Sequence, residues 1–324
     1  MSSRVRDLIR KVRSAKTGQQ EREIIAEESA KIRTHLKQSK VSNAHRTVSK
    51  MIFISMLGYS VKWGHVHVVS LCHNAKTHKE RRISYLGLSL LLPEDSQLLM
   101  MATNSAKLEL ESGDQYKQAV ALAALGATSS EEMLRQLTPV LVDMIDASVS
   151  KKQTYARKKA LFVAAKAVRY CPDVAGSFLD TALTALGDKS HAVVLAGAQL
   201  ALEMLDADEA CVDRMVKDRD LVPGLCRVLL GLAQQRSSGH DVGGVCDPFL
   251  QVSLLRLVSR LVKLGAEPGN AEEAVTSLLR ASVKGELSAA RVAVQFEAAH
   301  AAVRASLSQQ LCESASEALV DALQ

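Results

Sequence analysis

The chain has 324 residues, of which 47% are hydrophobic, only 3% are aromatic and 6 are proline, and its formal net charge is +6. Apolar residues that are mostly small or unbranched favour helices, and short β-branched runs such as residues 66–69 give little support to a β domain. Because neither a signal-peptide core nor the ~18 apolar residues of a membrane span occur, we expect a cytosolic protein with peripheral membrane contact.

The basic charge belongs to the N-terminal end. Residues 1–50 hold 13 Lys and Arg against 5 Asp and Glu, a net charge of +8, so the remaining residues sum to −2. This asymmetry indicates an anionic partner, which can be lipid headgroups, nucleic acid or an acidic protein motif. A solvated basic face explains the charge equally well when charge is the only evidence.

Apolar residues recur at helical spacing from the first segment onward. The series begins with Leu8 and Val12 and continues through residues 24–36 and 48–56. Ser129 to Glu132 predicts a capping box, Thr138-Pro139 predicts a helix start, and Pro248 opens a helix after the irregular stretch 234–247. Short breaks rich in Gly, Pro and Asp separate the segments: 58–60, 93–95, 113–114, 187–188 and 265–269.

The helical segments group into units of roughly 35 to 45 residues, the spacing of HEAT and armadillo arrays. Loops this short place successive helices antiparallel and adjacent. We therefore predict an all-α fold, an α-solenoid of HEAT/armadillo-like antiparallel helix pairs that forms a single domain over residues 1–324. Such arrays leave a long surface for partners, so binding is the default function.

The sequence offers no arrangement that predicts catalysis. It lacks the glycine-rich loops that bind nucleotide phosphates, and its 6 cysteines form no CxxC pair. The histidines near Cys72 do not share one helical face, so they do not predict a metal site: His65, His67, His73 and His78. We expect neither an enzyme nor a bound cofactor or metal.

Four stretches of the chain carry a family resemblance: residues 6–25, residues 56–87 with Gly58-Tyr59 and Tyr85-Leu86-Gly87, residues 155–160, and residues 240–252. Together they resemble gamma-type adaptin, a large subunit of clathrin adaptor complexes, and the last stretch resembles the gamma chain more than the alpha chain. The resemblance covers only the N-terminal part of a trunk, with no hinge or appendage, so a fragment and a truncated relative both remain open.

The resemblance implies a non-catalytic subunit of a heterotetrameric adaptor complex in vesicle-mediated protein transport. Its implied partners are a small sigma-type chain, a beta-type large chain and a medium chain, on trans-Golgi network or endosomal membranes and clathrin-coated vesicles. Acidic dileucine signals on cargo tails are a further implied ligand, and the matching position is Arg13. A guanidinium there can form charge-assisted hydrogen bonds with a glutamate of the signal.

Two membrane contacts are also implied. A GTP-bound Arf-family GTPase is expected to contact Val66, Val69 and Met101, although Val69 suits a core position equally well. Phosphoinositide headgroups are expected at a basic patch near the third helix: Lys37, Lys40, His45, Arg46 and Lys50. Such a patch gives weak, salt-sensitive adhesion, at about 1 kcal/mol for each cation.

Other binding functions fit the sequence less well. An armadillo receptor for peptides or nuclear transport presents a tryptophan ladder, and this chain has a single tryptophan, Trp63. Nucleic-acid binding is not expected, because residues 1–50 contain no aromatic side chain for base stacking. A coatomer or alpha-adaptin chain would share the fold with a different membrane.

Overall fold

The computed structural model describes residues 4–37, 43–146, 153–234, 239–283 and 288–323. In these ranges the regular structure is helical, with two short 3-10 helices (Lys62–Gly64 and Pro172–Val174) among the α-helices, and the β pairing consists of one isolated bridge between Val242 and Val245. The prediction of an all-α solenoid is thereby confirmed. The chain divides into two compact units, residues 1–140 and 141–324, and the single domain over residues 1–324 stays a prediction.

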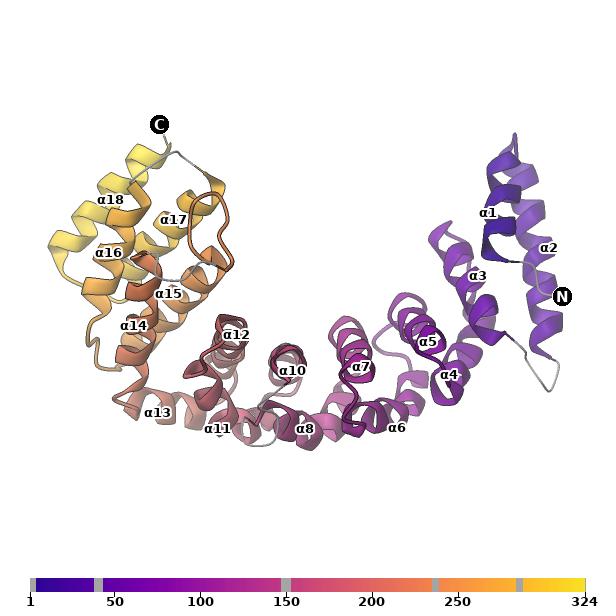
Figure 1. The fold of residues 1–324 in the computed structure, drawn as a ribbon, viewed down its shortest axis with the longest axis horizontal. Helices are drawn as coiled ribbons and strands as arrows, with labels where there is room; N and C mark the ends of the chain where they lie inside the picture. Colours follow the sequence, from indigo (N-terminus) through magenta and orange to yellow (C-terminus); the bar gives the residue numbers. More distant parts are fainter. Residues whose placement is uncertain (1–3, 38–42, 147–152, 235–238, 284–287, 324) are drawn as a thin grey trace. The chain divides into compact units, whose positions relative to one another are not determined.

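In the first unit, α3, α5 and α7 pack side by side, and α4 and α6 form a second layer against them (Figure 1). The N-terminal helix α1 packs on α2 and on α3. The helices are α1 (Val5–Ser14), α2 (Gly18–Leu36), α3 (Ala44–Met56), α4 (His65–Asn74), α5 (His78–Leu91), α6 (Leu98–Glu111) and α7 (Gln115–Ala127), and α8 (Glu131–Ile145) crosses the division between the units.

In the second unit, α10, α12, α15 and α17 pack in sequence as one layer, and α11, α13, α14 and α16 cover it (Figure 1). The final helix, α18, packs on α17 and α16. The bounds are α10 (Thr154–Tyr170), α11 (Ala175–Leu186), α12 (His191–Ala207), α13 (Glu209–Lys217), α14 (Leu221–Ala233), α15 (Pro248–Lys263), α16 (Ala271–Val283), α17 (Ala289–Arg304) and α18 (Gln309–Leu323).

Close helix packing explains one motif behind the family resemblance. Gly87 lies on α5, and a Cβ atom there would come within 2.8 Å of Val68 Cγ1 and 3.0 Å of Val48 Cγ1. These β-branched side chains have few rotamers, so they cannot move aside cheaply. The Tyr85-Leu86-Gly87 motif therefore brings α5 into contact with α3 and α4, and its role is structural.

The stretch 240–252 is also structural. Ser288 Oγ, at the N-cap of α17, donates a hydrogen bond to the Gly243 carbonyl at 2.9 Å. Asp247 Oδ2 lies 3.2 Å from His191 Nδ1 at the start of α12, and α15 begins at Pro248 as predicted. These residues tie α12, α15 and α17 together.

Two predicted helix starts are wrong. The first turn of α8 is capped by Ser130, whose hydroxyl accepts a hydrogen bond from the Met133 amide, whereas the Ser129 hydroxyl donates back to the Leu125 carbonyl. Pro139 lies inside α8 and does not open a helix. The capping motif misses the observed cap by one residue, whereas Pro139 lies two turns into α8, because a helix with favourable packing can accommodate an internal proline.

Candidate interaction surfaces of the first unit

The helices of the first unit alternate in direction, and this brings distant predicted residues to common ends. His45 at the start of α3 lies 3.8 Å from the Glu80 carboxylate in the first turn of α5. The rings of His78 and Tyr116, at the starts of α5 and α7, are 6.1 Å apart. The starts of α3, α5 and α7 therefore lie at one end, together with the ends of α4 and α6.

We call this the basic end, and it is defined by Arg46, Lys76, Lys79 and Arg82. Arg46 is half-buried, and the other three are exposed. Burial lowers the pKa of His45, and nearby Lys79 lowers it further against the opposing charge of Glu80, so His45 adds little charge at neutral pH. Lys37, directly after α2, is exposed, and Lys40 lies outside the described residues.

Lys50 does not belong to this end, which corrects the predicted patch. Its side chain is 3% exposed, and its ammonium lies 2.5 Å from the Glu28 carboxylate of α2, which is itself 8% exposed. Removing an ammonium from water is costly unless a carboxylate compensates it. Lys50 therefore joins α3 to α2 in the interior and cannot reach a membrane surface.

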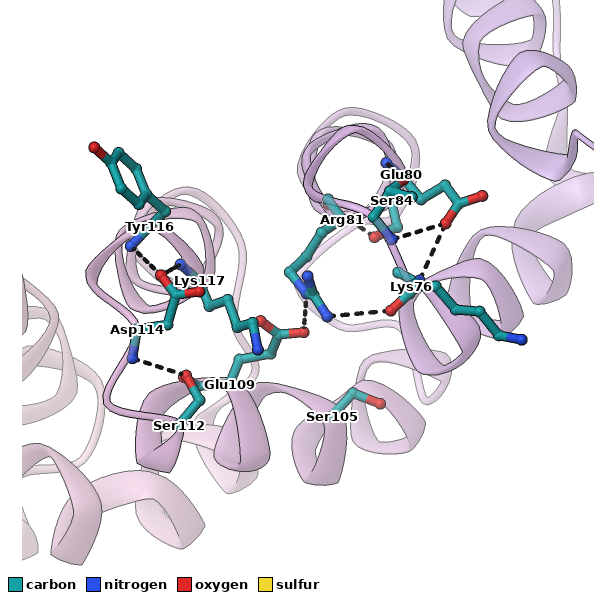
Figure 2. A network of polar contacts seen from close by, with 12 residues as sticks. Lys76, Glu80, Arg81, Ser84, Ser105, Glu109, Ser112, Asp114, Tyr116 and Lys117 are labelled. Atoms are coloured by element: carbon teal, nitrogen blue, oxygen red, sulfur yellow. Dashed lines mark hydrogen bonds and ion pairs between the residues drawn. The ribbon is translucent and has the colours of Figure 1, made fainter.

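Hydrogen bonds fix the backbone around the start of α5, where Lys76 and Lys79 lie, and Figure 2 shows those of Lys76, Glu80 and Arg81. Glu80 Oε2 accepts hydrogen bonds from the amides of Lys76 and Thr77, both at 3.0 Å, in a capping box. Arg81 pairs with Glu109 of α6 and donates to the Ala75 carbonyl at 3.1 Å. These two lysines were not predicted as part of the basic patch, although the Thr-x-x-Glu capping pattern at 77–80 is present in the sequence.

The opposite end of the same helices is apolar. Val66 in the first turn of α4 is 53% exposed, and Met101 in the first turn of α6 is 61% exposed. His73 Nδ1 of α4 lies 3.2 Å from Ser105 Oγ of α6. Seven residues, or two turns, before these positions are Val66 on α4 and Leu98 on α6. Met101 lies one turn after Leu98. The structure thus places the two predicted GTPase contacts at the same end of two adjacent helices.

Val69 is a core residue, which removes it from the predicted GTPase contacts. It is 4% exposed and points into the helix packing one turn after Val66. Further exposed apolar residues at this end, which were not predicted, include Met56 in the last turn of α3 and Leu90 near the last residue of α5. We call the set Met56, Val66, Leu90 and Met101 the apolar end.

Arg13 lies in the last turn of α1. Leu8 and Val12 bury one side of this helix, and Arg13, with Arg10 and Lys11, stays exposed. The histidines around Cys72 separate, with His65 and His67 opening α4 and His73 closing it. Within the described ranges, no helix has the length and apolar character to cross a membrane.

Comparison with known proteins decides the family. Residues 21–324 match the family described as the adaptin N-terminal region. The chain belongs to this adaptin family. Its fold is also similar to a homology model of the full-length AP-3 complex in an intermediate open conformation, with a TM-score of 0.58 and 20% identity over 86% of this chain and 44% of that chain.

Adaptin relatives of the gamma type match most of this chain. The AP-1 complex subunit gamma of Dictyostelium discoideum is 37% identical over 86% of this chain and 30% of its own length. The AP-1 complex subunit gamma-1 of Mycosarcoma maydis is 36% identical over 84% of this chain and 30% of its own length. The AP-1 complex subunit gamma-like 2 of Mus musculus is 34% identical, and the chain covers 34% of that relative. The chain therefore spans under half the length of these adaptins.

Proposed function

We propose that this adaptin region acts as the N-terminal part of a gamma-type large subunit in a heterotetrameric clathrin adaptor complex. The observation that carries the proposal is the 37% identity with the gamma subunit of an AP-1 complex over 86% of this chain. In this role the chain is not a catalyst. It supports a small sigma-type chain, joins a beta-type large chain and a medium chain, and works on the cytosolic face of trans-Golgi network or endosomal membranes and clathrin-coated vesicles.

Affinity purification of the tagged chain from its own cells tests this function. We expect recovery of a beta-type large chain, a medium chain and a small chain in comparable amounts. Recovery of nuclear-transport factors, or of coatomer subunits in place of these three, would contradict it.

Recruitment to the membrane uses both ends of the first unit. We assign the apolar end, with Val66 and Met101 at its centre, to a GTP-bound Arf-family GTPase, because exposed aliphatic side chains in adjacent first turns suit a partner's apolar surface. We assign the basic end, with Lys37, to phosphoinositide headgroups. Weak adhesion at each site becomes useful when both are engaged.

The basic end predicts how vesicle binding responds to charge. Replacing both Lys76 and Lys79 with glutamate is expected to weaken binding to phosphoinositide vesicles at least roughly thirtyfold, because each cation near an anionic surface contributes about 1 kcal/mol and the two glutamates add repulsion. Vesicle co-sedimentation at low and high salt measures this. The control is Lys62→Glu, which reverses the charge of another exposed lysine, before α4 at the apolar end, and should leave vesicle binding nearly unchanged. Vesicle binding that does not change with ionic strength would contradict the assignment of phosphoinositide headgroups to the basic end.

Arg13 predicts the response to cargo signals. In the assembled complex, Arg13→Glu is expected to lower affinity for an acidic dileucine peptide roughly tenfold, because a charge-assisted hydrogen bond becomes a repulsion. Fluorescence anisotropy with a labelled peptide measures the affinity. Lys11→Glu serves as the control, since Lys11 lies on the same helix, is exposed and points to another side. Equal affinities for the two variants would remove this role from Arg13.

A further inference from the structure

The two helix layers of the second unit differ in charge. Helices α10, α12, α15 and α17 together contain ten Lys and Arg against three Asp and Glu, whereas α11, α13, α14 and α16 contain four against five. Neither α10 nor α15 contains an acidic residue. Arg157, Arg169, Arg256 and Arg260 pair with carboxylates, and the layer still carries an excess of positive charge. This excess favours an anionic partner.

One face of α10 also carries exposed aromatic rings. Tyr155, Phe162 and Tyr170 are 51%, 40% and 45% exposed. Their spacing of seven and eight residues places them in one row, about 22 Å long at 1.5 Å per residue. Exposed rings in a row are costly in water, and aromatic residues are enriched where proteins meet partners. In a chain with so few aromatic residues, this row indicates a binding surface.

Lysines fill the positions between the rings. The ammonium groups of Lys158 and Lys159 lie 5.4 and 6.0 Å from the centre of the Tyr155 ring, and that of Lys166 lies 5.4 Å from the centre of the Tyr170 ring. These cation–π contacts hold the long lysine side chains in place beside the rings. A partner therefore loses less entropy in ordering them.

Helix α12 runs beside this row in the same direction. Arg157 donates to Asp188, just before α12, at 2.8 Å, and Arg169 Nε donates to Glu203 near the end of α12 at 3.0 Å. This register places half-buried Leu195 and Leu202 of α12 alongside Phe162 and Tyr170. The surface thus combines cations with rings and a partly apolar margin.

We propose that this face of α10 binds an acidic segment of a partner protein in which carboxylates alternate with apolar side chains. We call it the α10 face: Tyr155, Lys158, Lys159, Phe162, Lys166 and Tyr170. The carboxylates accept hydrogen bonds from the lysines, and the apolar side chains pack on the rings. An extended segment of about seven residues matches a row of ~22 Å. The α10 face contains none of the residues assigned to cargo, GTPase or lipid, so it goes beyond the proposed function.

A polypeptide fits the α10 face better than a nucleic acid does. Single-stranded nucleic acids bind by stacking successive bases on open aromatic faces. The Tyr155 and Tyr170 rings already hold lysine ammonium groups on their faces, which compete with bases for those positions. Carboxylates need only the ammonium groups, and aliphatic side chains pack against ring edges.

The test measures binding of the whole chain to synthetic probes by fluorescence anisotropy. The first probe is a peptide of alternating Glu and Leu, the second replaces each Leu with Ser, and the third is an oligothymidylate of equal length. We expect the Glu-Leu peptide to bind most tightly. Replacing Lys158 and Lys159 with glutamate is expected to weaken it at least tenfold, and roughly half a molar salt should weaken it likewise.

The matched control replaces Arg214 and Arg219 with glutamate, which changes the net charge equally at exposed positions outside the α10 face. It should bind the Glu-Leu peptide as the unaltered chain does. If the Lys158 and Lys159 variant loses helical content, glutamine at both positions replaces it and should still weaken binding. Equal binding by the α10 variant and the control, equal binding of the Glu-Ser peptide, or tighter binding of oligothymidylate would each overturn the proposal.

Discussion

Replacing Lys50 with alanine is expected to destabilise the first unit by about 3 to 5 kcal/mol, the range found when one partner of a buried ion pair is removed. The Lys50 and Glu28 side chains are almost completely buried, and their charged atoms are 2.5 Å apart. Alanine removes the ammonium that compensates the Glu28 carboxylate in the interior. Urea denaturation followed by circular dichroism measures the free energy of unfolding.

Helix α2 supplies a matched control for this variant. Lys31 and Glu27 are also 2.5 Å apart, but both side chains are more than half exposed. Lys31→Ala should leave the unfolding midpoint nearly unchanged, since exposed ion pairs contribute little. Changing both buried partners, Lys50 to methionine and Glu28 to glutamine, should recover most of the lost stability. If Lys50→Ala were no more destabilising than Lys31→Ala, the buried pair would not stabilise the packing of α2 on α3.

Replacing Met101 with glutamate is expected to abolish capture of the chain by a GTP-loaded Arf-family GTPase. Met101 is 61% exposed, so the carboxylate remains in water in the free chain and costs little stability. At the interface it would be buried among apolar side chains without a partner, which is strongly unfavourable. Pull-down with the immobilised GTPase, together with circular dichroism, measures binding and helical content. Val66→Glu should behave in the same way.

Two variants make this result specific. Leu108 is 59% exposed on the same helix but lies two turns away, toward the basic end, so Leu108→Glu should bind normally. Val69→Glu places a charge in the core and should lower helical content and the melting temperature. Normal binding by Met101→Glu, or equal loss of binding by Leu108→Glu, would contradict the assignment of the GTPase to the apolar end.

The secondary structure and fold class were predicted well from the sequence, whereas the exposure of individual side chains was predicted poorly. Periodic apolar residues and short breaks were enough for the all-α solenoid, because helical amphipathicity repeats every 3.6 residues whatever the helix packs against. Val66 and Val69 lie one turn apart with similar apolar neighbours, and only the packing of α4 shows that one is exposed and the other buried. Lysine is usually a surface residue. Lys50 is buried because its ammonium pairs with the carboxylate of Glu28, which lies 22 residues earlier in the chain.

The sequence alone therefore determined the helical fold, the absence of any motif that predicts catalysis, and the resemblance to adaptin that the family match confirmed, with gamma subunits among the similar relatives. The tertiary structure decided which of those residues can meet a partner. Alternating helix directions collect Lys76 and Lys79 with Arg46 at one end, and Val66 with Met101 at the other. That sorting depends on contacts between helices far apart in the chain, and local periodicity carries no information about it.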